Sequence, residues 1–234
     1  MLKIENLSKS YGDKKAVDGL SLHIKPGEIY GFIGHNGAGK TTTLKACCGI
    51  LAFEEGEIYV DGVRVKADPI ACKKKLAYIP DNPDLYPFMT GIQYLNFVGD
   101  IYKVPEEKRK ALIAEYAELF NLTGDLATKI NAYSHGMKQK LALISAFFHE
   151  PKLIIMDEPF VGLDPKASHA MKELMRKHCE KGGAIFFSTH VLEVAEKLCD
   201  KIAIIKDGKL IKEGTVYEVK GDTSLESVFL ELAE

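Results

Sequence analysis

One glycine-rich stretch, residues 34–42, restricts what this chain can fold into more than any other part of it. It reads Gly-His-Asn-Gly-Ala-Gly-Lys-Thr-Thr and lies between an apolar run over 28–33 and a helix-forming run that ends at Gly49. Glycines let the backbone turn back on itself and aim successive N–H groups inward, which forms a nest for phosphate oxygens. A helix beginning near Gly39 adds its positive N-terminal end to the same point. The stretch therefore predicts a strand, a phosphate-binding loop and a helix, in that order.

The spacing of Gly34, Gly39, Lys40 and Thr41 matches the Walker A pattern. In that pattern the lysine reaches the β- and γ-phosphates of a nucleotide, and the hydroxyl group ligates Mg²⁺. The alternative is a glycine-rich turn that binds nothing. Because the motif requires a strand before it and a helix after it, and both are expected here, we predict that the chain binds a nucleoside triphosphate.

Composition limits the class of protein. With 46% hydrophobic and 27% charged residues, the 234-residue chain can build the core of a globular protein. Its formal net charge of −2 gives no reason to expect a nucleic-acid partner. No apolar run approaches about 18 residues, and the charged start of the chain is unlike a signal peptide, so we expect no membrane span. The five cysteines form no C-x-x-C pair, which favours reduced cytosolic thiols over a redox or metal role.

Predicted strands and helices alternate along most of the chain. We expect two antiparallel strands over 2–26 with a turn at Gly12-Asp13, and a hairpin over 57–65 around Asp61-Gly62. Further strands are expected at 76–79, 153–156, 184–187, 202–205 and 210–211. Helices are expected after Asp164-Pro165, over 191–198 and in a short tail. This alternation predicts a mostly parallel sheet that is covered on both faces.

A helical block interrupts the alternation from about residue 88 to residue 150. Thr90 and Gln93 form a capping box at its start, and Pro105 opens a second helix with two acidic residues in its first turn. Ser134 is placed to cap a third helix. We therefore predict that this block is an insertion into the α/β core.

A second chemical motif ends the strand expected at 153–156. Four apolar residues lead there into Asp157 and Glu158. Since ligands of parallel sheets bind at the carboxyl ends of the strands, Asp157 is expected beside the phosphate-binding loop, where it can hold Mg²⁺ as a Walker B aspartate does. Glu158 is placed to orient or deprotonate an attacking water. The alternative is a strand that ends in surface acids.

Several further stretches, in the same order, resemble the nucleotide-binding domain of ATP-binding cassette (ABC) transporters. Residues 133–139, Tyr-Ser-His-Gly-Met-Lys-Gln, resemble the Leu-Ser-Gly-Gly-Gln signature, although His135 and Met137 depart from it. Residues 162–164 resemble the D-loop and 188–190 the H-loop. Asp81 stands where the Q-loop carries Gln, and Tyr11 stands at the position of the adenine-stacking aromatic residue. The resemblance covers essentially the whole chain.

This resemblance implies a P-loop NTPase (RecA-like) α/β core with an N-terminal antiparallel β-subdomain and an inserted α-helical subdomain. The implied boundaries within a single ABC ATPase domain are 1–87 and 151–220 for the nucleotide-binding core, 88–150 for the helical signature subdomain and 221–234 for a C-terminal tail.

The resemblance also implies ATP and Mg²⁺ as cofactors. Tyr11 would stack on adenine, the alternative being an ordinary strand-end aromatic, while Glu158 would act as general base and His190 would contact the γ-phosphate. Asp81 would assist catalysis and the metal, or else only solvate a turn. The implied nucleotide-binding residues are Tyr11, Gly34, His35, Asn36, Gly37, Ala38, Gly39, Lys40, Thr41, Thr42, Ser134 and Gly136, and the implied metal-binding residues are Thr41, Asp157 and Asp81.

The partners implied are an integral membrane permease and a second nucleotide-binding subunit, identical or not. Ser134 and Gly136 would then cap the ATP of the opposite subunit. The chain would be cytoplasmic and peripheral on the inner face of the cell membrane, held there through the permease. Its ending, residues 224–232, Asp81 and the signature variant are similar to the ABC-2 exporter type, so export is expected.

Two other functions stay open at this point. A cassette ATPase acting on ribosomes or DNA is disfavoured because the chain has one cassette, no sustained heptads and no basic stripe. A regulatory nucleotide-binding module without turnover is disfavoured because Glu158 is present. The permease would select the transported substrate, so the sequence of this chain does not identify it.

Overall fold

Strands form two sheets in the computed structural model, which describes residues 1–233. The larger sheet has the order β10-β9-β3-β8-β7-β6, and all its neighbours are parallel except the edge strand β10. Its strands are β3 (Ile29–Ile33), β6 (Leu76–Ile79), β7 (Leu153–Asp157), β8 (Ala184–Thr189), β9 (Lys201–Lys206) and β10 (Lys209–Thr215). The smaller sheet is antiparallel in the order β2-β1-β4-β5, with β1 (Leu2–Tyr11), β2 (Lys14–Ile24), β4 (Glu55–Val60) and β5 (Val63–Arg64).

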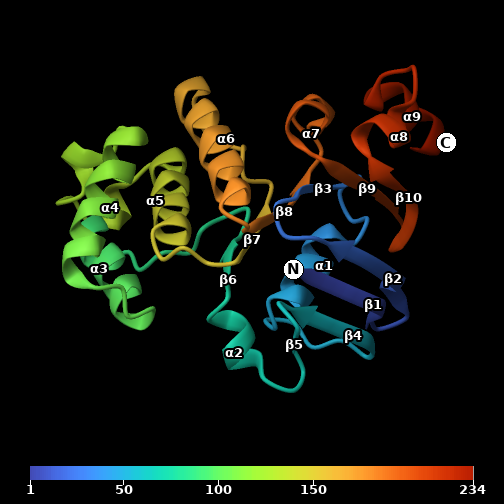
Figure 1. The fold of residues 1–234 in the computed structure, drawn as a ribbon, viewed down its shortest axis with the longest axis horizontal. Coiled ribbons are helices and arrows are strands. Elements are labelled where there is room, and N and C mark those ends of the chain that lie inside the picture. The colour runs from blue at the N-terminus through green and yellow to red at the C-terminus, as the bar shows by residue number, and fades with distance from the viewer. Residues whose placement is uncertain (234) are drawn as a thin grey trace.

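The parallel sheet is covered on both faces, as the alternation predicts. Every residue of β3, β7 and β8 is buried, which explains why these strands read as continuous apolar runs. In Figure 1, α6 (Pro165–Glu180) and α7 (Leu192–Leu198) lie above the sheet, and the antiparallel sheet lies below it. The lower face also packs against α1 (Lys40–Cys47), whose Leu44 and Cys47 share a hydrophobic cluster with Phe32 and Ile155.

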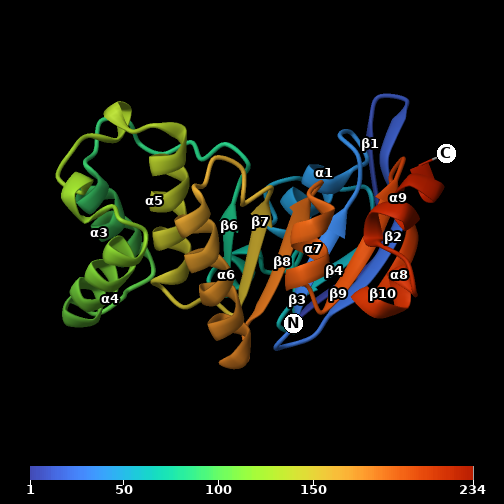
Figure 2. The same ribbon diagram turned by 90° about the horizontal axis from the view of Figure 1, so that it is seen from above.

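The helices of the inserted block lie together at one end of the molecule, seen most clearly from above (Figure 2). They are α3 (Gly91–Ile101), α4 (Glu106–Leu119) and α5 (His135–Phe147), with short 3₁₀ turns at Thr123–Asp125 and Ile130–Ala132. The capping box of Thr90 and Gln93 is formed, and Ser134 Oγ accepts the N–H of Met137 at the start of α5. These local signals therefore predicted the helix starts correctly.

Two helical parts of the fold differ from the sequence prediction. A one-turn helix, α2 (Pro69–Lys73), was not predicted, although Asp68 caps it by accepting the N–H of Ala71. After β10 the sequence predicted one short helical tail, but the structure has two helices, α8 (Val216–Lys220) and α9 (Leu225–Ala233). Gly221 ends α8 because its backbone has a positive φ of +58°, which a helix cannot continue through. Val219 and Leu225 join a small core with Ile202 of β9, so both helices pack on the sheet.

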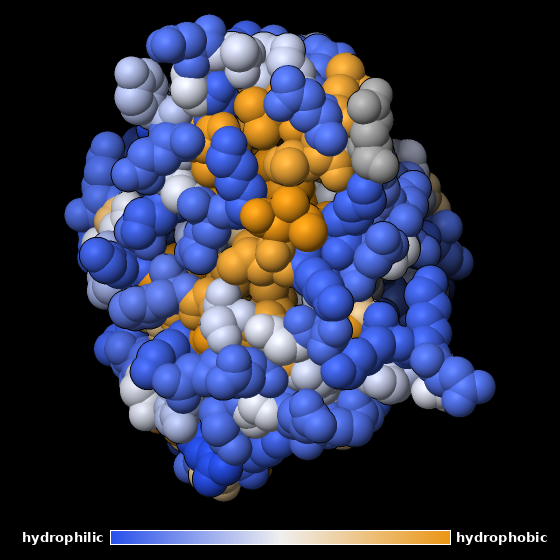
Figure 3. Space-filling model, turned by 90° about the vertical axis from the view of Figure 1, so that its right-hand side faces the viewer, coloured by the Kyte–Doolittle hydropathy of each residue, from blue (hydrophilic) through white to orange (hydrophobic). Residues whose placement is uncertain are grey.

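The face formed by the C-terminal elements carries a band of hydrophobic side chains (Figure 3). Exposed apolar residues of these elements include Ile211 on β10, Tyr217 on α8 and Leu230 on α9. Among residues 1–233, no helix combines the length and the hydrophobicity that crossing a membrane requires.

Candidate functional site

A cavity of about 350 Å³ lies where β3 and β7 end. It brings together most of the residues that the sequence singles out, from four separate parts of the chain. A larger cavity of about 530 Å³ lies at the opposite ends of the strands, next to Pro26, Lys152 and Gly183, and contains none of those residues. The lining of the smaller cavity is Tyr11, Lys14, Ala16, His35, Asn36, Gly37, Gly39, Lys40, Thr41, Thr42, Asp81, Asp157 and Glu158.

Close packing requires glycine at two positions of the loop over residues 34–39, Gly34 and Gly39. A Cβ atom on Gly39, which has φ +107°, would lie 2.3 Å from the carbonyl oxygen of Ala16. A Cβ atom on Gly34 would lie 2.6 Å from the carbonyl oxygen of Ile205. The loop is thus clamped between β2 and β9, and its chain turns directly into α1 at Lys40. This is the strand, loop and helix order that the sequence predicts.

Lys40 places a buried positive charge inside the loop. Its side chain is 7% exposed, and Nζ donates to the carbonyl oxygens of Gly34 at 2.6 Å and His35 at 3.2 Å. Burial lowers the pKa of Lys40, while the carboxylates of Glu158 and Asp157 oppose that shift. The ammonium group is therefore poorly solvated, and its partners among residues 1–233 are two neutral carbonyls and the carboxylate of Glu158, 3.8 Å away. Such a group is suited to bind an anion.

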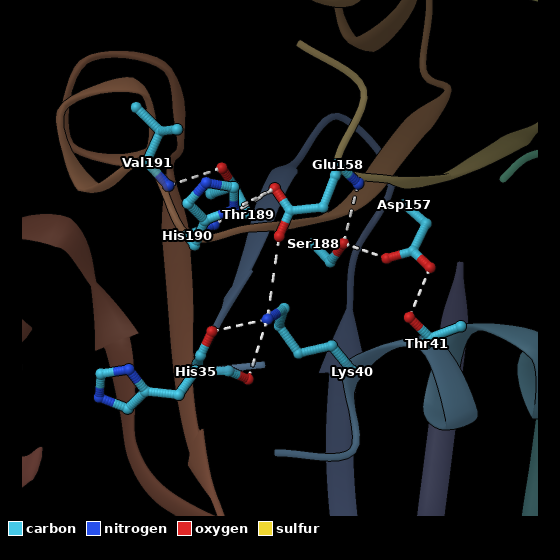
Figure 4. Close-up of polar contacts among 10 residues, drawn as sticks. His35, Lys40, Thr41, Asp157, Glu158, Ser188, Thr189, His190 and Val191 are labelled. Atoms are coloured by element: carbon cyan, nitrogen blue, oxygen red, sulfur yellow. Dashed lines mark hydrogen bonds and ion pairs between the residues drawn. The ribbon is translucent and has the colours of Figure 1, made fainter. Parts of the chain in front are cut away.

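A chain of hydrogen bonds connects the loop helix to the end of β7 (Figure 4). Asp157 Oδ2 accepts from Thr41 Oγ1 at 2.6 Å, and Oδ1 accepts from Ser188 Oγ at 2.5 Å. Ser188 Oγ also accepts the N–H of Glu158 at 3.0 Å. The sequence predicted Asp157 beside the loop, but it assigned no role to Ser188. The register that pairs Asp157 with Ser188 across β7 and β8 is tertiary information. The local signals at Ser188 were its place in the stretch that resembles the H-loop and a hydroxyl at the end of a buried strand.

Glu158 lies at the centre of the site. Its Oε2 lies 2.9 Å from Nδ1 of His190 and accepts the backbone N–H of His190 at 3.3 Å (Figure 4). Its Oε1 accepts no hydrogen bond from residues 1–233 and faces Lys40. The backbone of Glu158 is left-handed, with φ +47°, which is uncommon for a residue with a side chain. One carboxylate oxygen is thus held by His190, and the other is available.

The remaining predicted residues either line the cavity with exposed side chains or lie outside it. Gly34 and Ala38 belong to the loop but do not line the cavity, and His190 reaches it only through Glu158. Tyr11 lies at the rim with its ring largely exposed, and Asp81, which is also exposed, lines the same cavity. Lys14 and Ala16, which the sequence analysis did not single out, complete the rim from β2.

Ser134 and Gly136 do not line this cavity. Both lie at the start of α5, which is fixed to the segment after Glu158 by the side chains that follow them. Gln139 Nε2 donates to the carbonyl oxygen of Pro159 at 3.2 Å, and Lys140 Nζ forms an ion pair with Asp164 at 2.7 Å. The first turns of α5 are therefore connected to the segment that follows β7.

Comparison with known sequences agrees with this geometry. The protein-family profile described as "ABC transporter" matches residues 17–161, more than half of the chain. This chain belongs to the ABC transporter family. It is an ABC ATPase, and the predictions of family, fold class and enzymatic class are confirmed.

Known members of the family match this cassette over nearly its whole length. It is 36% identical over 230 residues to the linearmycin resistance ATP-binding protein LnrL of Bacillus subtilis (strain 168), covering 97% of this chain and 74% of that protein. It is 35% identical over 213 residues to the Nod factor export ATP-binding protein I of Paraburkholderia xenovorans (strain LB400), covering 91% and 70%.

Solved structures show the same fold. An ATP-binding subunit of an ABC transporter superimposes with a TM-score of 0.96 at 33% identity, covering 100% of both chains. The ATP-binding cassette MJ0796, in a dimeric post-hydrolysis state bound to ADP and Pi, superimposes with a TM-score of 0.84 at 26% identity, covering 92% of this chain and 99% of that one. A nucleotide-binding cassette fold is therefore established, while the roles of individual residues stay predictions.

Proposed function

We propose that this cassette hydrolyses Mg²⁺-bound ATP and uses the reaction to drive a separate membrane permease. The observation that supports this most strongly is the grouping of Lys40, Thr41, Asp157 and Glu158 around one cavity. Lys40 and the N–H groups of the loop would bind the β- and γ-phosphates, assisted by the positive end of α1. Tyr11 would stack on the base.

The oxygen atoms present fit Mg²⁺. Thr41 Oγ1 and Asp157 Oδ2 are 2.6 Å apart, close to the roughly 3 Å between neighbouring ligands of an octahedral ion with bonds of about 2.1 Å. Mg²⁺ takes few protein ligands and completes its shell with water and phosphate oxygens, and when bound it neutralises charge on the phosphates. Asp81 lines the same cavity and is a candidate outer partner of the ion.

The hydrolytic step follows from the position of Glu158. We expect its available oxygen, Oε1, to accept a proton from the water that attacks the γ-phosphate. His190 holds Oε2 and so fixes the direction of the carboxylate. Lys40 stabilises the negative charge of the phosphate oxygens, which is the main contribution that a protein makes to phosphoryl transfer.

A second cassette subunit would complete the site. Ser134 lies exposed at the N-terminal end of α5 and outside the cavity of its own chain, so a nucleotide on another subunit is its natural partner. The similarity to dimeric structures of MJ0796 supports this arrangement. Because α5 is tied to Pro159 and Asp164, each subunit's signature would follow changes at its own Glu158.

ATP is expected to join two copies when hydrolysis is blocked. Glu158→Gln with saturating ATP should elute as a dimer in size-exclusion chromatography with light scattering, and as a monomer without nucleotide. Ser134→Arg, added to Glu158→Gln, should prevent dimerisation but not ATP binding, because a large charged side chain would fill the contact at the end of α5. A Glu158→Gln protein that stays monomeric at high concentration would contradict self-pairing and favour a different cassette as partner.

The permease is expected to dock beside the cavity. Tyr86, an exposed aromatic residue a few positions after Asp81, packs against Phe88, Tyr94 and Phe97 at ring-centre distances of 5.6–6.3 Å. Exposed aromatic clusters are typical of protein interfaces. Similar proteins support both partner and direction, since one is a Nod factor export ATP-binding protein and another, cbiO1, is part of the transporter complex cbiONQ. We infer export and a peripheral position on the cytoplasmic face of the membrane.

Phe88→Ala is expected to reduce co-purification of the cassette with its permease from membranes by about tenfold or more, as loss of an aromatic anchor does. Tyr217→Ala is the matched control, because Tyr217 is an aromatic residue of similar exposure (72% against 68%) on a different face. ATP hydrolysis by the isolated cassette should be the same for both variants. Equal recovery of the permease with Phe88→Ala and with the parent would contradict this docking surface.

A further inference from the structure

One buried hydroxyl group connects Asp157, the last residue of β7, with Glu158, the residue that follows it. Ser188, on β8, is completely buried, and its Oγ contacts both Asp157 and Glu158 (Figure 4). We propose that Ser188 is a positioning residue for ATP hydrolysis, which fixes the metal-binding carboxylate of Asp157 and the backbone of the general base Glu158 at the same time. This inference rests on the proposed roles of those two residues.

The direction of both hydrogen bonds is fixed by chemistry. A hydroxyl group has one proton and two lone pairs, and a backbone N–H can only donate. Ser188 Oγ must therefore accept from Glu158 N–H, at 3.0 Å, and its own proton goes to Asp157 Oδ1, at 2.5 Å. These two hydrogen bonds fix the orientation of the Ser188 hydroxyl group. The hydroxyl therefore holds Asp157 and Glu158 in one arrangement relative to each other.

The bond to Asp157 sets the plane of that carboxylate. Asp157 is buried, with 3% of its surface exposed, and its two oxygens have different partners, Ser188 on one side and Thr41 on the other. A buried carboxylate needs such donors to compensate for lost hydration. Without Ser188 the group could rotate away from Thr41, and the pair of oxygens suited to Mg²⁺ would no longer be held together.

The bond to Glu158 holds an unusual backbone. With φ +47°, Glu158 has a conformation that a residue with a Cβ adopts only when its surroundings enforce it. That conformation turns the side chain from the strand direction toward His190 and Lys40. Since the N–H that Ser188 accepts belongs to the same residue, losing the hydroxyl would release the turn that aims the base.

The test is Ser188→Ala, measured by steady-state hydrolysis over a range of Mg²⁺ concentrations. We expect kcat to fall by about 10- to 100-fold and the Mg²⁺ concentration for half-maximal rate to rise several-fold, as happens when supporting groups of a metal site are removed. Binding of ATP without Mg²⁺ should change by less than about twofold, because Lys40 and the loop are untouched. Ser188→Thr keeps the hydroxyl and should recover activity relative to Ser188→Ala.

A matched control distinguishes a positioning role of Ser188 from a general effect of losing a buried serine. Ser145 is also a buried serine, but its Oγ donates to the carbonyl oxygen of Ala142 within α5, away from the site. Ser145→Ala should keep kcat and the Mg²⁺ dependence of the parent. If Ser188→Ala does not fold, Ser188→Cys, which has similar volume and weaker hydrogen bonds, takes its place with the same expectations. Parent values of kcat and Mg²⁺ dependence in the folded variant would overturn the proposal.

Failure of this proposal and failure of the proposed function give different results. If Asp157→Asn and Glu158→Gln abolish hydrolysis while Ser188→Ala keeps the parent kcat and Mg²⁺ dependence, the hydrolytic roles stand and the positioning role is wrong. If Asp157→Asn and Glu158→Gln keep the parent rate, the assignment of the site itself is wrong.

Discussion

Replacing Glu158 with glutamine is expected to slow ATP hydrolysis by about 10²-fold or more and to leave ATP binding intact. Its carboxylate has a buried oxygen, Oε1, that accepts no hydrogen bond from the described residues, and a general base contributes about 10²- to 10⁴-fold to a rate. Glutamine keeps the length of the side chain and an oxygen that can accept from the His190 N–H, so the geometry should survive while the proton acceptor is lost. Phosphate release and equilibrium ATP binding are the two measurements.

Glu193→Gln is the matched control for this substitution. Glu193 lies nearby on α7, but it is exposed and pairs with Lys197 at 2.6 Å outside the cavity. The Glu193→Gln protein should hydrolyse ATP at the parent rate. If Glu158→Gln does so as well, the base is a different group, and Asp81 is the next carboxylate on the cavity wall to be tested.

The sequence predicted those parts of the fold and site whose signals are local. The loop at 34–42 carries its whole motif within nine residues, and the turn at Asp61-Gly62 and the cap at Thr90 need only their neighbours. Asp157 could be placed beside the loop because a general rule connects strand ends with ligand sites in parallel sheets. In each case no distant contact had to be known.

The missed features depend on contacts between distant parts of the chain. Ser188 joins the site only because β8 pairs with β7 in a register that puts it opposite Asp157. Lys14 and Ala16 reach the cavity because β2 crosses the loop, which the alternation of strands does not reveal. The length of β10 was underestimated because its polar and charged residues give little hydrophobic pattern, and its backbone bonds to β9 define it.

Removing the charge of Lys40 is expected to have the largest effect on binding. Lys40→Met keeps the aliphatic stem, but the phosphate loses a charged donor, and hydrogen bonds to charged groups contribute about 1.5–3 kcal/mol. The ATP dissociation constant should therefore rise roughly 10- to 100-fold. The lysine is already poorly solvated, as its lowered pKa indicates, so little hydration opposes its transfer to a phosphate.

Thermal unfolding gives an independent measure of the same loss. A ligand at about 100 times its dissociation constant stabilises a protein by about 2.7 kcal/mol, and a 100-fold weaker affinity reduces that to about 0.4 kcal/mol. The melting temperature of Lys40→Met should hence respond only slightly to an ATP concentration that clearly stabilises the parent. Lys45→Met, which removes a lysine from the same helix but outside the cavity, should respond as the parent does. An undiminished ATP response in Lys40→Met would mean that the backbone N–H nest and the end of α1 bind the phosphates without the lysine.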